Sequence, residues 1–427
     1  MSAHSDPEGP IVIQDAQVLM PSGEILTKDV AMSDGKITAV GTDLTIASNT
    51  RTIDAQGLLL LPGAIDSHAC VEAVAFGQER SVLDESCAYV RGGITSLISA
   101  IHPLKSPAQS PKKPDKIAVP NKEGLATTEL DISELSNRFS KSRINYGFSI
   151  TAQQAERSFD LTDKACCISL RSVSEDSAQI ESLFMSQNSL ITFHVQESER
   201  QNLRLEMETL VARSRQYERR IHFQGISTIE AVELLYRDKP SWVTASVTPQ
   251  QLMSGSLPLR SSLWQALLDG ALDCIETHHT SRAIADSDQG LNRSELASSK
   301  AAQPHYGPHY GPIAEIALPL MLTQAQMGHC TVAQVANWMS TRIADIYGIA
   351  RKGTIEPGYD ADVVLVDLLT YRPILKEEIQ TVAGWSPFEM EPLTGWPVVT
   401  IVGGQVAYEY GEMNAVASGH ALQFDAN

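Results

Sequence analysis

Three histidines and one cysteine stand where this sequence could carry out chemistry. The stretch 58–70 reads as two short apolar strands broken by a Pro-Gly pair, and it ends on His68 and Cys70. His194 closes another apolar run, and His278 follows a third. Polar side chains at the C-terminal ends of strands are where barrel enzymes place their catalytic groups. Imidazole and thiolate groups also suit a zinc ion.

The elements that must position these residues are alternating strands and helices. Strand-like runs, each followed by helix-compatible sequence, alternate through the middle of the chain, a pattern typical of a (β/α)8 barrel. Strands are expected over 190–194, 220–224, 241–247 and 271–277. After the second of these, Ser227 is the expected N-cap of a helix, because Glu230 completes a capping box.

Both chain ends read as short β-strands. Residues 11–54 form alternating segments separated by turn residues, including the hairpin signal Ser33-Asp-Gly-Lys. Residues 353–367 and 398–409 form a turn, a buried strand and a hairpin about Gly403-Gly404. The first segment is too short to be a complete domain, and the local pattern at both ends shows only strands.

Composition restricts the partners. The chain has 427 residues, 43% of them hydrophobic, which is ample for a large core. Lys plus Arg number 33 against 51 Asp plus Glu, giving a net charge of -18. This balance argues against binding to nucleic acid or to an anionic membrane surface. Apolar runs are too short to span a bilayer, and six cysteines without a CxxC pair favour a reducing, cytoplasmic location.

The segment around His68 resembles a known family. Pro-Gly-Ala-Ile-Asp-Ser-His-Ala-Cys, residues 62–70, resembles the first barrel strand of the amidohydrolase superfamily, in its dihydroorotase, allantoinase and dihydropyrimidinase branch. That branch has Pro-Gly-x-Ile-Asp-x-His-x-His, and both of its histidines bind metal. The resemblance extends over about residues 60 to 410 and implies a (β/α)8 barrel inserted into a β-sandwich built from both chain ends. The implied domains are 1–60 (sandwich), 61–348 (barrel) and 349–427 (sandwich).

The resemblance also implies that most metal-binding positions are changed here. Cys70 replaces the second histidine, and the strand 165–171 contains no lysine to serve as the carboxylated bridging ligand. His194 matches a ligand strand, whereas Gln224 occupies the place of the next ligand histidine. The family's Thr-Asp-His carries the catalytic aspartate, and the residue in that position is His278.

The positions that bind the substrate in the resembling family also carry different residues here. Glu72 replaces the arginine that binds the substrate carboxylate in dihydroorotases, and an acid there would repel that anion. His102 corresponds to a substrate-binding asparagine, and 248–252 reads Thr-Pro-Gln-Gln-Leu in place of Thr-Pro-His-His-Leu. His279 and Arg282 could bind an anionic ligand, although adjacent polar residues in a loop are more often simply solvated.

Two interpretations of the histidines follow. His68, Cys70, His194 and His278 together suit a four-coordinate zinc, which would be structural if no coordination position stayed open. A histidine that has lost its partners is more often a hydrogen-bonded interior residue, so the expectation without further information is no bound cofactor. Asp66 is expected to support the strand end by hydrogen bonding rather than to act as a base.

Three functions are compatible with these observations. The first, which we favour, is a dihydroorotase-like protein of pyrimidine biosynthesis that has lost catalysis and serves, within an oligomer, as a structural or regulatory subunit of aspartate transcarbamoylase; the resemblance suggests this partner. The second is an active cyclic-amide hydrolase with an altered metal site. The third is a small-molecule binding module that keeps the pocket only.

Overall fold

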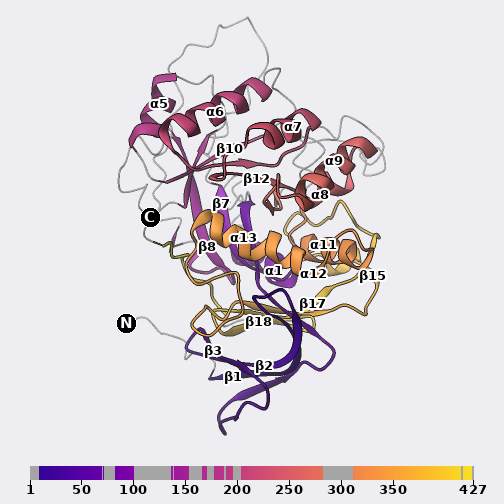
Figure 1. Cartoon of the computed structure of the whole chain (residues 1–427). Helices are drawn as coiled ribbons and strands as arrows, with labels where there is room; N and C mark the ends of the chain where they lie inside the picture. Colours follow the sequence, from indigo (N-terminus) through magenta and orange to yellow (C-terminus); the bar gives the residue numbers. More distant parts are fainter. Residues whose placement is uncertain are drawn as a thin grey trace, which may run out of the picture.

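The computed structural model contains a curled parallel sheet surrounded by helices and a second sheet below it (Figure 1). The residues it describes are 9–69, 71, 82–100, 136–137, 139–152, 166–170, 177–186, 189–195, 203–281, 311–414 and 417–425.

The first sheet forms the barrel. Its eight strands are hydrogen-bonded in chain order, and every neighbouring pair is parallel. Parallel neighbours joined by helical crossovers are the pattern of a (β/α)8 barrel, so the predicted fold class is confirmed. The strands are β6 (Ala64–Ala69), β7 (Ile94–Ala100), β8 (Asn145–Thr151), β9 (Cys167–Leu170), β10 (Leu190–His194), β11 (Ile221–Gln224), β12 (Val243–Val247) and β13 (Cys274–Ile275).

Asp66 joins the two edges of this sheet. It lies on β6 and accepts hydrogen bonds from the backbone N of Thr277 at 3.0 Å and from the Thr277 hydroxyl at 2.5 Å. Thr277 follows β13 at the opposite edge, and both residues are buried. The sheet therefore curls until its first and last strands meet. Asp66 supports the strand end, as the sequence predicted.

Helices from the crossover connections lie against the barrel, with α5, α6, α7 and α9 on its far side from the second sheet (Figure 1). Thr228, rather than the expected Ser227, is the N-cap of α7, because its side chain accepts a hydrogen bond from Ala231 N. The described helices are α1 (Val82–Arg91), α5 (Ser177–Ser186), α6 (Leu203–Tyr217), α7 (Ile229–Asp238), α8 (Pro249–Met253), α9 (Leu257–Leu268), α11 (Ala317–Gln326), α12 (Val332–Ala336), η4 (Asn337–Thr341), α13 (Arg342–Tyr347) and η5 (Lys376–Glu378).

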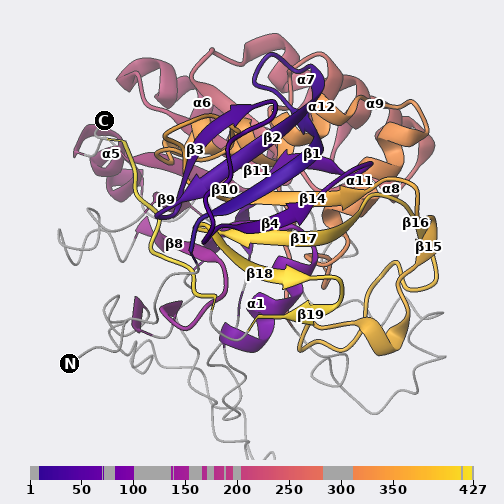
Figure 2. The same ribbon diagram turned by 90° about the horizontal axis from the view of Figure 1, so that it is seen from below.

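The second sheet combines strands from both ends of the chain. Its order is β19-β18-β17-β14-β5-β1-β2-β3, with β4 pairing to β1, so that Leu61 of the N-terminal part lies opposite Val364 of the C-terminal part. Figure 2 shows the indigo strands β1 and β2 beside β14 and β17. Its strands are β1 (Ile11–Leu19), β2 (Ile25–Ser33), β3 (Lys36–Gly41), β4 (Arg51–Asp54), β5 (Leu59–Pro62), β14 (Val363–Asp367), β17 (Trp396–Val402), β18 (Gln405–Glu409) and β19 (Glu412–Met413). A separate ribbon pairs β15 (Arg372–Pro373) with β16 (Pro392–Leu393).

The two predicted hairpins are confirmed. Asp34 and Gly35 connect β2 to β3 with φ values of 52° and 72°, and Gly403 and Gly404 connect β17 to β18 with φ values of 54° and 78°. Two consecutive left-handed residues define the type I′ turn, whose twist matches that of antiparallel strands.

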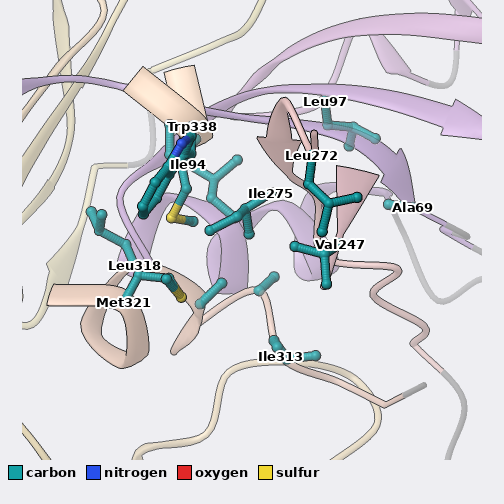
Figure 3. Close-up of a cluster of buried hydrophobic side chains, with 14 of the residues drawn as sticks. Ala69, Ile94, Leu97, Val247, Leu272, Ile275, Ile313, Leu318, Met321 and Trp338 are labelled. Carbon is teal, nitrogen blue, oxygen red and sulfur yellow. The ribbon is translucent and has the colours of Figure 1, made fainter. Parts of the chain in front are cut away.

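Buried apolar side chains pack the last two strands of the barrel against two of the helices that follow them in the chain. Figure 3 shows Trp338, Leu318 and Met321 gathered with Ile275 and Val247 in one buried cluster. The cluster joins β12 and β13 to α11 and η4. This packing supports the ends of the two strands, where polar residues follow. None of the helices in the described ranges has both the length and the apolar composition that a bilayer-spanning segment needs.

A buried ion pair connects the barrel to the second sheet. Asp362 pairs with Lys352 and accepts hydrogen bonds from Asn145 Nδ2 at 3.0 Å and from Gly403 N at 2.7 Å. The side chains of Asp362 and Lys352 are only 5% and 6% exposed. One carboxylate therefore holds together β8 of the barrel, the β17–β18 hairpin and the segment leading into β14.

Removing this carboxylate should destabilise the whole molecule. Asp362→Ala removes one of the two carboxylates that pair with the buried Lys352, the other being Asp360 at 3.1 Å, and takes the acceptor away from Gly403 N. Losing a buried hydrogen-bonding partner typically costs ~1–3 kcal/mol. We expect a clear fall in the thermal unfolding midpoint, measured by circular dichroism. Asp54→Ala, which alters an exposed carboxylate in the same domain, should change stability by no more than ~0.5 kcal/mol. Equal midpoints for the two variants would contradict the assigned role.

Candidate metal centre

Three histidines meet at the C-terminal end of the barrel. His68 lies on β6, His194 ends β10 and His278 follows β13. One candidate ligand atom from each lies within 4.8 Å of the others. The ring centroid of His68 is 4.9 Å from that of His194 and 4.5 Å from that of His278. We call these three residues the histidine cluster.

The closest pair in the cluster has the spacing of two ligands on one ion. His194 Nε2 lies 3.3 Å from His278 Nδ1. Two nitrogens bound to zinc at about 2.0–2.1 Å with tetrahedral angles are themselves about 3.3 Å apart. Three neutral imidazoles are also a donor set that zinc and its neighbours in the periodic table prefer. The residues present therefore fit a single divalent transition-metal ion.

Glu276 lies beneath His278 inside the barrel. Its Oε1 accepts from His278 Nε2 at 2.7 Å and from the Ser246 hydroxyl at 2.5 Å, and its Oε2 accepts from the Ser67 hydroxyl at 3.0 Å. Burial favours the neutral acid, but the imidazoles of His278 and His222 outweigh it and lower the pKa of Glu276 to about 2. Glu276 is therefore a carboxylate with its oxygens engaged.

Gly225 makes room for His278. A Cβ on Gly225 would lie 2.5 Å from Cε1 of the His278 ring, and Gly225 itself has a φ of 72°. His278 has a φ of 51°, a left-handed conformation that is uncommon for residues other than glycine. The backbone turn after β13 and the glycine after β11 together determine where this imidazole lies.

Asp66 lies two residues before His68 on β6, and its oxygens are engaged by Thr277. Burial raises the pKa of Asp66 to about 6, although its hydrogen bonds from Thr277 oppose that rise. A third hydrogen bond, from His68 N at 3.4 Å, ties the carboxylate to the strand backbone. Its position identifies Asp66 as the closure of the barrel, with its oxygens directed at backbone and hydroxyl donors.

Comparison with known proteins agrees with this architecture. The family model described as "Amidohydrolase family" matches residues 312–407. A dihydroorotase of Methanosarcina acetivorans is 24% identical, with 91% of this chain and 90% of that protein covered, and a dihydroorotase of Elusimicrobium minutum is 27% identical, with 94% and 98% covered.

Solved structures share the fold over nearly the full length. A dihydropyrimidinase from Brevibacillus agri has a TM-score of 0.77 at 19% identity, covering 97% of this chain and 98% of that one. A D-hydantoinase has a TM-score of 0.79 at 18% identity, covering 97% and 99%. This chain belongs to the amidohydrolase superfamily. Within it, the similarity lies with the dihydroorotase- and dihydropyrimidinase-like branch.

Gln224 is the residue that the family resemblance predicts in place of a ligand histidine. It ends β11 directly opposite His194 in the strand register, and it is buried. Its Nε2 donates to the Tyr347 hydroxyl at 3.1 Å, and within the described part of the chain its Oε1 has no hydrogen-bond partner. The side-chain amide of Gln224 is thus bonded to Tyr347, the last residue of α13.

His279 forms a structural link. Its Nε2 lies 2.6 Å from Glu85 Oε1, and its Nδ1 accepts from the backbone N of Ile313 and of Ala314, each at 3.1 Å. Because Nδ1 accepts, the proton is on Nε2 and is donated to Glu85. Both ring nitrogens are engaged and the residue is fully buried, so His279 joins α1, through the Glu85 carboxylate, to the segment that precedes α11.

Two buried glutamates hold the segment 380–382 against the barrel. Glu85 accepts from the Thr381 hydroxyl at 2.7 Å and from Val382 N at 2.9 Å. Glu315 accepts from the backbone N of Gln380 and of Thr381, and it lies 3.7 Å from Arg91. Burial raises the pKa of Glu315 to about 7, although Arg91 and the two backbone donors oppose the rise.

Several residues proposed from the sequence lie outside the described residues: Cys70, Glu72, His102 and Arg282. The five described cysteines are free thiols, four of them buried.

The sequence reasoning did not identify Glu276, Gly225 or Glu85. Glu276 had a local signal, because it is an acidic residue near the end of the predicted strand 271–277, two positions before His278. Gly225 and Glu85 have no such local signal, since their partners lie in distant segments.

Filling the space at Gly225 should displace His278. Gly225→Ala places a methyl group against the imidazole, and overpacking of this kind costs ~1–3 kcal/mol. We expect lower thermal stability and loss of zinc retained after gel filtration. Gly270→Ala is the matched control, because Gly270 also has a positive φ (79°) but nothing lies within 4 Å of its added Cβ. Equal zinc content in both variants would show that Gly225 does not position the ligand.

Glu315 should make stability depend on pH. Its pKa is 4.5 in the unfolded reference and about 7 in the folded protein, so the folded state holds an extra proton between these values. Its contribution is therefore full below pH 4.5 and is lost as the pH rises through 7, with a size of ~3 kcal/mol.

Thermal midpoints from pH 5 to pH 8 test this linkage. Glu315→Gln should flatten the decline with pH, whereas Glu377→Gln, at an exposed position, should keep the slope of the natural protein. A Glu315→Gln curve parallel to that of the natural protein would contradict it.

Proposed function

We propose that this chain is a dihydroorotase-like homologue of pyrimidine biosynthesis that does not hydrolyse dihydroorotate, and that it serves as a structural or regulatory subunit of an oligomer with aspartate transcarbamoylase. The observation that carries the proposal is the state of position 278. Where the family has a catalytic aspartate, this chain has His278, whose Nε2 is bonded to Glu276 and whose Nδ1 faces His194.

Ring hydrolysis needs a group that accepts a proton at the reacting centre. Among the described residues, the carboxylates next to the histidine cluster are Asp66 and Glu276, and both are engaged with other donors. This arrangement supports a centre that can hold an ion without a carboxylate positioned to act as a base.

The partner in this proposal rests on the resemblance to dihydroorotase homologues that assemble with aspartate transcarbamoylase. The full-length similarity to proteins named dihydroorotase supports the same pathway. A subunit that only provides an interface needs its fold and not its reacting groups. Retention of the barrel and second sheet is therefore compatible with a structural role after catalysis has been lost.

A metal-dependent hydrolase acting on another cyclic amide is the second candidate. It is favoured by the cluster itself, since three protein ligands with a fourth position open is the arrangement of catalytic zinc sites. An ion bound there would supply Lewis acidity toward a ring carbonyl. His68, His194 and His278 would hold it, and Glu276 would keep the His278 ring in place.

Turnover by the zinc-loaded full chain separates the two candidates. We expect dihydroorotate to be hydrolysed no faster than in a protein-free zinc control, with an authentic dihydroorotase assayed in parallel. Dihydroorotate turnover near that of the authentic enzyme, abolished by His68→Ala, would overturn the proposal. Zinc-dependent hydrolysis of hydantoin or dihydrouracil, again abolished by His68→Ala, would establish the second candidate instead.

The partner is tested by mixing the chain with aspartate transcarbamoylase from the same organism. We expect the two proteins to elute together in size-exclusion chromatography and to sediment as one species. Separate elution at micromolar concentrations of both would exclude the subunit role.

A further inference from the structure

We propose that Glu276 is a positioning residue that makes His278 offer its Nδ1 atom to a divalent transition-metal ion held by the histidine cluster. The inference rests on the ion-binding part of the proposed function and assigns a role to a residue outside the cluster. It concerns how the ion is held, and is independent of whether catalysis occurs.

The hydrogen bonds determine the tautomer of His278. A carboxylate can only accept, so the 2.7 Å contact between Glu276 Oε1 and His278 Nε2 requires the proton to be on Nε2. The other ring nitrogen, Nδ1, then carries the lone pair, and this is the atom that lies 3.3 Å from His194 Nε2. The reverse tautomer would turn an N–H group toward the cluster and leave no lone pair there for an ion.

Two further hydrogen bonds fix the orientation of the Glu276 carboxylate. Ser246 donates to the same oxygen that His278 uses, and Ser67 donates to the other oxygen. These donors come from β12 and β6, on opposite sides of β13, and the Glu276 side chain is 0% exposed. Three strands therefore fix the carboxylate plane, which in turn fixes the orientation of the ring.

Glu276 acts through His278 and not as a ligand itself. Its Oε1 is directed at the Nε2 side of the ring, opposite to the nitrogen that faces His194. Carboxylates that accept from the second nitrogen of a ligand histidine raise its basicity, and removing them typically weakens metal affinity by about 10–100-fold.

The backbone of His278 and the space around its ring are compatible with this orientation. His278 has a left-handed φ of 51°, and Gly225 leaves space for its ring. The hydrogen bond to Glu276 engages Nε2, and Nδ1 is the nitrogen that faces His194. Glu276 and His278 therefore form a unit, in which one residue supplies the lone pair and the other determines where it points.

The test measures zinc affinity on the full chain by competition with a chromophoric chelator. Glu276→Gln should weaken zinc binding by about 10–100-fold. Glu85→Gln is the matched control, because Glu85 is also a buried glutamate bonded to a histidine, His279, at 2.6 Å, but outside the cluster. This control should bind zinc within about twofold of the natural protein, as a residue that only supports the fold would.

Cobalt substitution gives a second readout that general destabilisation does not produce. The visible spectrum of the Co²⁺ form reports the number and geometry of its ligands, and it should change in Glu276→Gln and stay the same in Glu85→Gln. If Glu276→Gln does not fold, Glu276→Asp retains the buried charge but withdraws the carboxylate from His278, and it should weaken zinc binding in the same direction.

The outcomes separate this inference from the proposed function. Zinc affinity and cobalt spectrum unchanged in Glu276→Gln would overturn the positioning role. Absence of zinc binding by the natural protein would overturn it as well, yet leave the non-catalytic subunit intact. Rapid dihydroorotate hydrolysis would overturn the non-catalytic subunit, while weakened binding in Glu276→Gln would still support the role of Glu276.

Discussion

The contact between Asp66 and Thr277 is the constraint on which the rest of the barrel depends. It joins the first strand to the segment after the last one, through two hydrogen bonds buried from solvent. Neighbouring parallel strands are joined by long crossover connections, so no local turn brings the first and last strands together. Once they meet, His68 and His278 face one another, and His194 completes the cluster from across the barrel.

The interior below the cluster is unusually polar for a barrel of this kind. Such interiors are normally filled with branched apolar residues, but here Glu276, His222 and Ser246 share the centre with Tyr347. A buried carboxylate is tolerated only when its oxygens are fully hydrogen-bonded. The donors around Glu276 meet that requirement, and the same bonds that stabilise it also determine the orientation of His278.

A second pair of buried glutamates connects the periphery to this centre. Glu85 and Glu315 accept from the backbone of the segment 380–382, and Glu85 also holds His279, the residue after His278. A segment outside the barrel is therefore linked through hydrogen bonds to His279, which lies outside the histidine cluster. The ion pair of Asp362 performs the corresponding task at the junction with the second sheet.

Local sequence patterns determined the elements of this protein, and tertiary structure decided how its site is built. Strand and helix alternation, the hairpins at Asp34-Gly35 and Gly403-Gly404, and histidines at strand ends were all predictable, because they depend on residues a few positions apart. The barrel was predicted from this alternation and from the family resemblance, whereas the domain built from both chain ends followed from the resemblance alone. Which polar residues meet could not be read locally. The partnership of Glu276 with His278, the space at Gly225 and the structural use of His279 arise between segments far apart in the chain, and barrel closure alone brings them together.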